Sequence, residues 1–364
     1  MERVHFLVLI FFYAHLRCAV GSNNVPGIFI FGDSTIDAGN NRFIPNCTVQ
    51  ADFPPYGITF FHHPTGRFTD GRTVSDFISE FLELPLQKPL LEIEHEIANG
   101  TRKNFPTNGI NFASAGSGVL PATNSEYGVI PIQVQLQQFK TLVEQNRIDK
   151  KLVRDSLFFI QSGNNDLFGY FIINPFDPPT LTPNAYVQSM VAQVEDFVDT
   201  IYKLGARRIS LFGLGPVGCI PARALLPGAP VRKCYGKMNR MVKVFNTGLE
   251  NIVTSFPVKY SGAIGVFGAT YEIFHILQTN PKHYGFNDIE NACCGYGKLG
   301  GELQCGMEGY TLCKSPNDHL FWDYFHPTES AYKFISKALW AGGPNNIRPF
   351  NLKKLCNITL PNNI

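Results

Sequence analysis

Short runs of β-branched and aromatic residues alternate with segments of helical periodicity along most of the chain. The short runs predict strands at 27–31, 109–113, 157–160, 208–212 and 263–267. Between them, apolar residues recur every three or four positions and predict helices over 73–84, 132–147, 186–204 and 238–256. A last helix is expected from Pro327 onward, since proline is well tolerated in a first helical turn. Because strands that alternate with helices form a parallel sheet covered on both faces, we expect an α/β fold with a mainly parallel, five-stranded sheet.

No stretch rich in charge or in Gly and Ser divides the chain, so a single domain is expected over residues 22–364. Residues 1–21 have Arg3 near the start, an apolar stretch over 6–14 and small residues near the end, which is typical of a cleaved secretory signal peptide. The apolar stretch is far shorter than the ~20 residues that a membrane span needs, and no later stretch is long enough. The sequence therefore predicts a secreted, extracellular protein without a transmembrane segment.

The charge of the chain without residues 1–21 is almost balanced. Loss of Glu2, Arg3 and Arg17 leaves 29 basic and 28 acidic residues. Proteins that bind nucleic acid concentrate positive charge, and a net charge of +1 gives no such excess. Nucleic acid is therefore not an expected partner.

Export would place the cysteines in an oxidising compartment. Eight follow the signal peptide, at positions 47, 219, 234, 293, 294, 305, 313 and 356. The four within 293–313 would suggest zinc in a reducing compartment, but disulfides are the better interpretation in an exported chain. Because Cys219 and Cys234 flank a loop rich in Pro and Gly, we expect a bond between them, and at least one more within 293–313. Three Asn-X-Ser/Thr sequences, which agree with export, predict N-glycosylation at Asn46, Asn99 and Asn357.

Three of the predicted strands end in small or polar residues. The turns read Gly-Asp-Ser at 32–34, Ser-Ala-Gly-Ser-Gly at 114–118 and Gly-Asn-Asn-Asp at 163–166. The carboxyl ends of parallel strands lie on one edge of a sheet, so the three turns should converge on one crevice. Ser34 is then the candidate nucleophile, and a glycine N–H beside an asparagine amide would stabilise the oxyanion of acyl transfer. The alternatives are that Asp33 or Ser34 caps the next helix and that each glycine turn is a plain loop.

A serine nucleophile needs a base that a third group holds in place. Asp323 and His326 are three residues apart near the start of the last predicted helix, so one tight turn would set the carboxylate against the imidazole. Two residues at this spacing can also bind a metal ion, but no further cluster of His and Asp nearby completes such a site, and we expect no metal. The other histidines that follow the signal peptide have no acid in an equally suggestive turn.

Four sequence blocks contain these candidate residues: G-D-S-T-I-D-A-G-N-N around Ser34, N-F-A-S-A-G around Gly116, G-N-N-D around Asn165 and D-Y-F-H-P around His326. In this order they resemble the blocks of the SGNH hydrolases, and specifically of the plant GDSL esterase/lipase family. The resemblance covers nearly the whole mature chain, because four further stretches share it: F-P-P-Y-G-I at 53–58, G-R-F-T-D-G-R at 66–72, L-G-A-R-R-I at 204–209 and G-P-V-G-C-I-P at 215–221. One departure is Thr35, which stands where the family has its namesake leucine and is expected to alter packing rather than abolish activity.

The resemblance implies a flavodoxin-like α/β/α sandwich, the SGNH hydrolase fold. It also implies a triad of Ser34, His326 and Asp323, an oxyanion held by Ser34, Gly116 and Asn165, and no metal or organic cofactor. The implied activity is hydrolysis of a small-molecule or lipid ester through an acyl-enzyme. Three alternatives stay open: an acyltransferase with the same residues, a carbohydrate acetylesterase, and a non-catalytic binding protein, which would have no reason to keep all five positions.

An apolar segment follows Asn165 and ends at Pro178 and Pro179, which halt any helix. Its start should lie beside the oxyanion hole. Phe168, Phe171 and Phe176 are therefore candidates for a hydrophobic pocket or lid that binds the acyl chain. The alternative is that these side chains pack inward as ordinary core, as buried Phe usually does.

Overall fold

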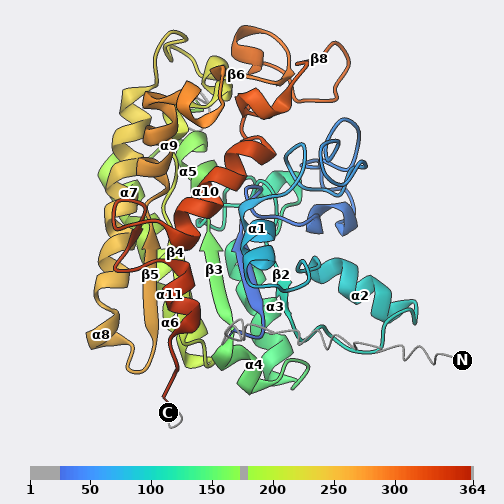
Figure 1. The fold of residues 1–364 in the computed structure, drawn as a ribbon, viewed down its shortest axis with the longest axis vertical. Helices are drawn as coiled ribbons and strands as arrows, with labels where there is room; N and C mark the ends of the chain where they lie inside the picture. The colour runs from blue at the N-terminus through green and yellow to red at the C-terminus, as the bar shows by residue number, and fades with distance from the viewer. Residues whose placement is uncertain (1–24, 173–178, 362–364) are drawn as a thin grey trace, which may run out of the picture.

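A computed structural model describes residues 25–172 and 179–361. Its centre is a six-stranded sheet in the order β10-β5-β4-β3-β1-β2 (Figure 1). The strands are β1 Ile28–Gly32, β2 Gly109–Asn111, β3 Leu157–Gln161, β4 Arg208–Phe212, β5 Ile264–Gly268 and β10 Ile347–Arg348. The five predicted strands are confirmed and run parallel in the flavodoxin-like order 2-1-3-4-5. The predicted number of five strands was wrong by one, because β10 has only two residues and gives no periodic signal; it pairs antiparallel with β5.

Both faces of the sheet are buried, because side chains alternate along each strand. In β1, Phe29 and Phe31 belong to one core cluster, whereas Ile28 and Ile30 belong to the other. The first cluster lies under α3, α6 and α7, and the second under α1, α9, α10 and α11 (Figure 1). The helices are α1 Val74–Phe81, α2 Leu90–Ala98, α3 Ile132–Glu144, α4 Lys150–Asp155, α5 Asn164–Tyr170, α6 Pro183–Lys203, α7 Gly236–Thr254, α8 Phe256–Lys259, α9 Thr270–Thr279, α10 Glu329–Ala341 and α11 Leu352–Asn357. The architecture is therefore the expected α/β/α sandwich.

The four long predicted helices correspond to α1, α3, α6 and α7, and their ends lie within three residues of the prediction. The last helix, α10, begins at Glu329 rather than at Pro327, because the Thr328 side chain accepts a hydrogen bond from the Ala331 N–H and so caps the helix. α9 was not predicted. None of the described helices combines the length and the apolar character that crossing a membrane requires.

Disulfides cross-link the loop after β4 and the segment 288–321, which precedes α10. Cys219 bonds to Cys234, Cys293 to Cys313 and Cys294 to Cys305, so both predictions about pairing are confirmed. Two small sheets lie within segment 288–321. In one, β6 Asp288–Ala292 pairs with β9 His319–Phe321; in the other, β7 Cys294–Gly295 pairs with β8 Thr311–Leu312. Cys47 and Cys356 are buried free thiols, so the even number of cysteines does not lead to complete pairing.

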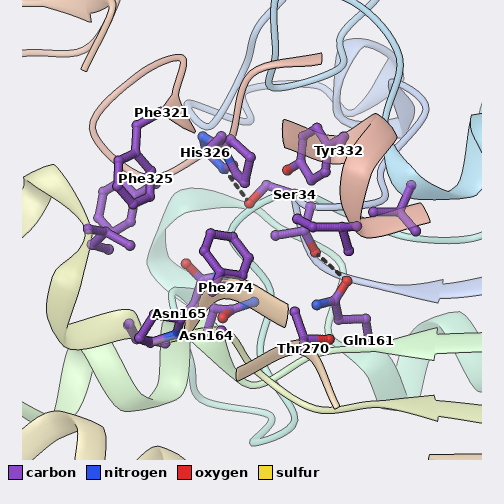
Figure 2. Close-up of a pocket in the computed structure, with 18 of the residues that line it drawn as sticks. Ser34, Gln161, Asn164, Asn165, Thr270, Phe274, Phe321, Phe325, His326 and Tyr332 are labelled. Carbon is purple, nitrogen blue, oxygen red and sulfur yellow. Dashed lines mark hydrogen bonds between the residues drawn. The ribbon is translucent and has the colours of Figure 1, made fainter. Parts of the chain in front are cut away.

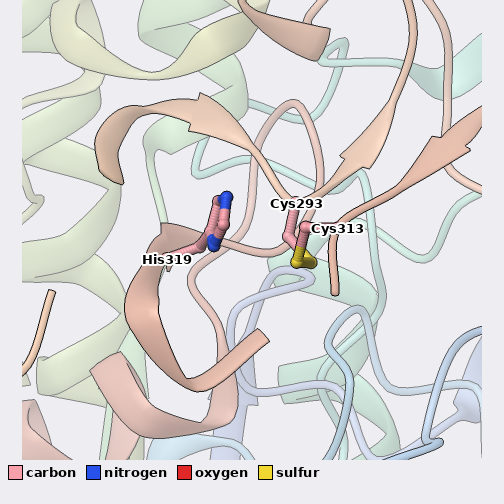
Figure 3. A group of neighbouring side chains, drawn as sticks. All are labelled: Cys293, Cys313 and His319. Atoms are coloured by element: carbon pink, nitrogen blue, oxygen red, sulfur yellow. A yellow bond between two sulfur atoms is a disulfide. The ribbon is translucent and has the colours of Figure 1, made fainter. Parts of the chain in front are cut away.

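One group of three possible metal ligands lies in the described part of the chain. The ligand atoms of Cys293, Cys313 and His319 are within 4.8 Å of one another. Figure 3 shows that the two sulfur atoms are bonded to each other, so neither can bind a metal as a thiolate. His319 Nδ1 instead lies 2.7 Å from Asp318 Oδ1. The structure therefore favours the disulfide interpretation of this cysteine cluster over the zinc alternative.

Candidate active site

β1 carries Ser34 to the carboxyl edge of the sheet. Gly32 ends the strand where β3 approaches so closely that a Cβ atom would lie 1.8 Å from the Gln161 carbonyl oxygen, so only glycine fits. Asp33 closes the turn, since its Oδ1 accepts from the Thr35 N–H at 3.0 Å. Burial raises the pKa of the Asp33 carboxyl, and its hydrogen bonds oppose that rise. A local capping role therefore describes Asp33, and the Ser34 hydroxyl bonds elsewhere.

The Ser34 hydroxyl meets a histidine from the far end of the chain. Ser34 Oγ lies 2.7 Å from His326 Nε2 (Figure 2), and His326 Nδ1 lies 2.7 Å from Asp323 Oδ1. Because a carboxylate only accepts hydrogen bonds, Nδ1 carries the proton and Nε2 accepts from the serine hydroxyl. All three residues are buried, and Ser34 is the most exposed at 8%. The arrangement is that of a nucleophile, a base and the group that orients the base.

A tight turn between β9 and α10 produces the contact of Asp323 with His326. Asp323 Oδ1 also accepts from the backbone N–H groups of Phe325 at 2.9 Å and of His326 at 2.8 Å. These bonds close the turn that the D-x-x-H spacing predicted. The expectation that no other histidine has a comparable acid was wrong, because His319 contacts the adjacent Asp318. His326 is nevertheless the histidine that contacts Ser34.

The predicted oxyanion residues come from the loops after β2 and β3. Asn165, in the first turn of α5, lines a cavity beside Ser34 (Figure 2). Its Nδ2 donates to the Ser117 carbonyl at 2.9 Å. Gly116 precedes Ser117 and has a φ of 81°, in the left-handed region that favours glycine. Gly116 is not one of the described residues that line the cavity. The neighbouring Asn164 donates to Asp33 Oδ2 at 3.0 Å and also lines the cavity.

Residues 37–41 hold the loop after β2 against the Ser34 turn. Asp37 Oδ2 accepts from the Ala115 N–H at 2.9 Å, and Asn41 Nδ2 donates to the Ala115 carbonyl at 2.9 Å. Burial raises the pKa of Asp37 to about 6, although three backbone N–H groups oppose the rise. Sequence reasoning missed this role. The available signal was the polar run directly after Ser34, which a surface loop would explain equally well.

The cavity beside Ser34 has a volume of about 70 Å³. Its wall is mostly apolar and includes Val74 from α1 and Leu339 from α10. Phe274 from α9 also lines it (Figure 2). Thr35 and Gln161 also line it, and Thr35 Oγ1 lies 3.3 Å from Gln161 Oε1. The residue at the position of the family's namesake leucine therefore faces the cavity.

Of the predicted acyl-pocket residues, the two that the structure describes, Phe168 and Phe171, do not belong to this wall. Phe168 is 6% exposed, belongs to the core and packs its ring against Phe325 with 4.7 Å between centroids. Phe171 packs against Tyr235 at 5.1 Å, and Phe176 lies outside the described residues. α5 begins at Asn164 and turns Phe168 into the core, so the core alternative holds for Phe168.

The true wall was not recognised from sequence for a physical reason. Val74, Ile335 and Leu339 lie on the same apolar stripes that attach α1 and α10 to the sheet. Periodicity identifies such a stripe but does not distinguish a position that borders a cavity from one that borders only protein. Only the three-dimensional structure therefore identifies these residues as part of the cavity wall.

Comparison with known proteins agrees with this geometry. The family model for GDSL-like Lipase/Acylhydrolase matches residues 28–339, a range that contains Ser34, Asp323 and His326. The chain is 63% identical to GDSL esterase/lipase 6 of Arabidopsis thaliana over 337 aligned residues. The aligned region covers 93% of this chain and 92% of that protein. The chain is 34% identical to GDSL esterase/lipase 5 of the same plant, over 93% of this chain and 89% of that protein. It is also 34% identical to GDSL esterase/lipase 7, over 92% of each.

Proposed function

This chain belongs to the GDSL-like lipase/acylhydrolase family, and we propose that its carboxylic ester hydrolysis proceeds through an acyl-enzyme formed on Ser34. One observation carries the proposal: Ser34 Oγ lies 2.7 Å from His326 Nε2, and the other ring nitrogen lies 2.7 Å from Asp323. These contacts meet the geometric requirement for a serine that a neighbouring base activates.

The reaction has two similar steps. His326 Nε2 takes the hydroxyl proton while Ser34 Oγ attacks the ester carbonyl carbon, and Asp323 stabilises the imidazolium. The tetrahedral oxyanion collapses, the bond to the alcohol oxygen breaks, and His326 returns the proton to the departing alcohol. Water, deprotonated by the same imidazole, then attacks the acyl carbonyl carbon. The bond from this carbon to Ser34 Oγ breaks, His326 returns the proton to Oγ, and the acid leaves. An alcohol in place of this water would give acyl transfer, so product analysis with an added alcohol distinguishes the two activities.

The oxyanion would be held by the N–H groups of Ser34 and Gly116 together with the Asn165 amide. The Asn165 amide has two N–H donors, of which one reaches the Ser117 carbonyl, so the second is available to a substrate in the cavity. Donors of this kind act on charge that develops in the transition state, and they therefore change kcat more than KM.

Replacing Asn165 by Ala should lower kcat by about 10²–10³-fold with little change in KM, because one oxyanion donor is lost. Steady-state kinetics on a soluble ester measures this. Asn291→Ala, at an exposed asparagine of β6, is the matched control and should leave kcat unchanged. An Asn165→Ala protein with wild-type kcat would remove Asn165 from the oxyanion hole.

The cavity supports a short acyl group as the substrate. A water-sized group needs roughly 10–15 Å³, so a cavity of about 70 Å³ has room for roughly five such groups. An apolar wall favours an aliphatic chain through burial of its surface. We therefore assign the chain to esters whose acyl group has about four to six carbons.

This assignment predicts that kcat/KM for nitrophenyl esters peaks at about four to six acyl carbons and falls for palmitate. Phe274→Ala enlarges the cavity and should move the optimum to longer chains. Phe139→Ala, in α3, is the matched control: it should lower the free energy of unfolding by about 3–5 kcal/mol and leave the optimum in place, because Phe139 is core and its ring partners do not line the cavity. A wild-type preference for palmitate, or an equal shift in both variants, would contradict the assignment.

Secretion is the location that best fits the molecule. Residues 1–21 would be removed as a signal peptide and residues 22–364 would remain as one domain. Three disulfides support this location, since such bonds persist in oxidising compartments. The predicted glycosylation sites Asn46, Asn99 and Asn357 are all exposed, as attachment of a glycan requires.

A further inference from the structure

Asp323 has a partner that the reaction scheme does not use. The Tyr56 hydroxyl donates to Asp323 Oδ2 at 2.8 Å, although the two residues are 267 positions apart. Both residues are fully buried. Burial raises the pKa of the Tyr56 phenol well above its usual value, so the hydroxyl keeps its proton and acts as a donor.

The two carboxylate oxygens of Asp323 have different partners. Oδ1 accepts from two backbone N–H groups and faces His326 Nδ1 at 2.7 Å. Oδ2 accepts from Tyr56 and lies 2.9 Å from His326 Nδ1. Tyr56 is thus the partner that fixes the second oxygen, and with it the rotation of the carboxylate plane against the imidazole.

Simple core packing does not explain a tyrosine at this position. The ring packs edge-on against Trp322, Phe53 and Phe68 with centroid distances between 5.5 and 6.1 Å. A phenylalanine ring would make the same contacts without placing a hydroxyl in a fully buried site, where an unpaired hydroxyl is costly. The hydroxyl is therefore accounted for by its bond to Asp323, beside the longer bond of 3.4 Å that it accepts from Gln304 Nε2.

The stretches 53–58 and 66–72 surround the turn that carries Asp323 and His326. The Phe68 ring lies 5.0 Å from the His326 ring, and the Thr69 hydroxyl donates to the Pro327 carbonyl at 3.0 Å. Asp70 Oδ1 accepts from the Glu329 N–H at 2.8 Å at the start of α10. Two sequence stretches that contribute no reacting atom thus hold the acid–base turn in place.

We propose that Tyr56 is a positioning residue of the esterase, which acts on His326 only through Asp323. It donates to the carboxylate at a place that solvent does not reach, and so keeps the plane of that carboxylate aligned with the imidazole. This inference rests on the triad proposed above. Tyr56 is then the fourth side chain in a chain of hydrogen bonds that runs from Ser34 through His326 and Asp323.

The test is a double-mutant cycle of Tyr56→Phe and Asp323→Asn. Tyr56→Phe alone should lower kcat about 10- to 100-fold with KM unchanged, which is the effect of losing one hydrogen bond to a charged group. In the Asp323→Asn background, the same change should have almost no further effect, because the carboxylate through which it acts is gone. A residue that only supports the fold would lower kcat by the same factor in both backgrounds.

Tyr260→Phe is the matched control, since the Tyr260 hydroxyl also donates to a carboxylate, that of Asp199, away from the cavity. It should leave kcat unchanged. Equal factors in both backgrounds, an unchanged kcat, or a Tyr56→Phe protein that does not fold would each overturn the positioning role. If Asp323→Asn itself retained full kcat, the proposed triad would fail instead, so the two failures are distinguishable.

Discussion

Replacing Ser34 by Ala is expected to lower kcat for any ester by about 10⁶-fold while the protein stays folded, as removal of the nucleophile does in serine hydrolases. The hydroxyl that faces His326 at 2.7 Å would be absent, and the Cβ methyl group cannot attack a carbonyl. The loss of a single oxygen atom from a residue that is 8% exposed leaves the surrounding turn intact, because Asp33 closes it. Steady-state kinetics and thermal unfolding of the same preparation measure both statements.

Ser189→Ala is a suitable control for Ser34→Ala. Ser189 lies in α6, where its hydroxyl donates to the Tyr186 carbonyl within the helix. Its removal should leave kcat unchanged. If Ser34→Ala retained activity near that of this control, Ser34 would not be the nucleophile.

Asp323→Asn is expected to lower kcat by about 10⁴-fold with little change in KM. An asparagine amide can donate to His326 Nδ1, which allows the tautomer whose Nε2 carries the proton and cannot accept the proton of Ser34. The backbone N–H groups of Phe325 and His326 could still reach the remaining carbonyl oxygen, so the turn should persist. Circular dichroism beside the kinetics separates the loss of chemistry from a loss of fold.

The protein contains a matched control for this substitution. Asp318 Oδ1 lies 2.7 Å from Nδ1 of the next residue, His319, which is the same kind of contact as that between Asp323 and His326. His319, however, does not line the cavity. Asp318→Asn should therefore leave kcat unchanged. A similar fall in both variants would mean that the region responds to loss of charge rather than to loss of imidazole orientation.

Most of the sheet was predictable because its strands are buried on both faces and therefore read as continuous apolar runs. Residues 28–31 and 157–160 are examples, and their parallel pairing places Ser34 and Asn165 at one edge. The turn of Asp323 was also predictable, since a carboxylate three residues before a histidine closes on it locally. Local signals of this kind survive without knowledge of the fold.

Other features depend on contacts between distant positions, and sequence reasoning could not supply them. Tyr56 and Asp323 meet only because the stretch at 53–58 folds over the turn before α10. Phe168 lies in an apolar segment that suggested a pocket, but α5 directs its side chain into the core. Phe274 had no distinguishing signal, because α9 itself was not predicted.

The most direct test of the central claim is to identify the atom that becomes acylated. A phosphonate ester with a good leaving group reacts with an activated serine and mimics the tetrahedral intermediate, and mass spectrometry of the digested protein locates the adduct. The account predicts a single adduct on Ser34, formed in proportion to the loss of esterase activity and strongly reduced in His326→Ala. An adduct on another residue that accompanies inactivation, with Ser34 unmodified, would contradict it.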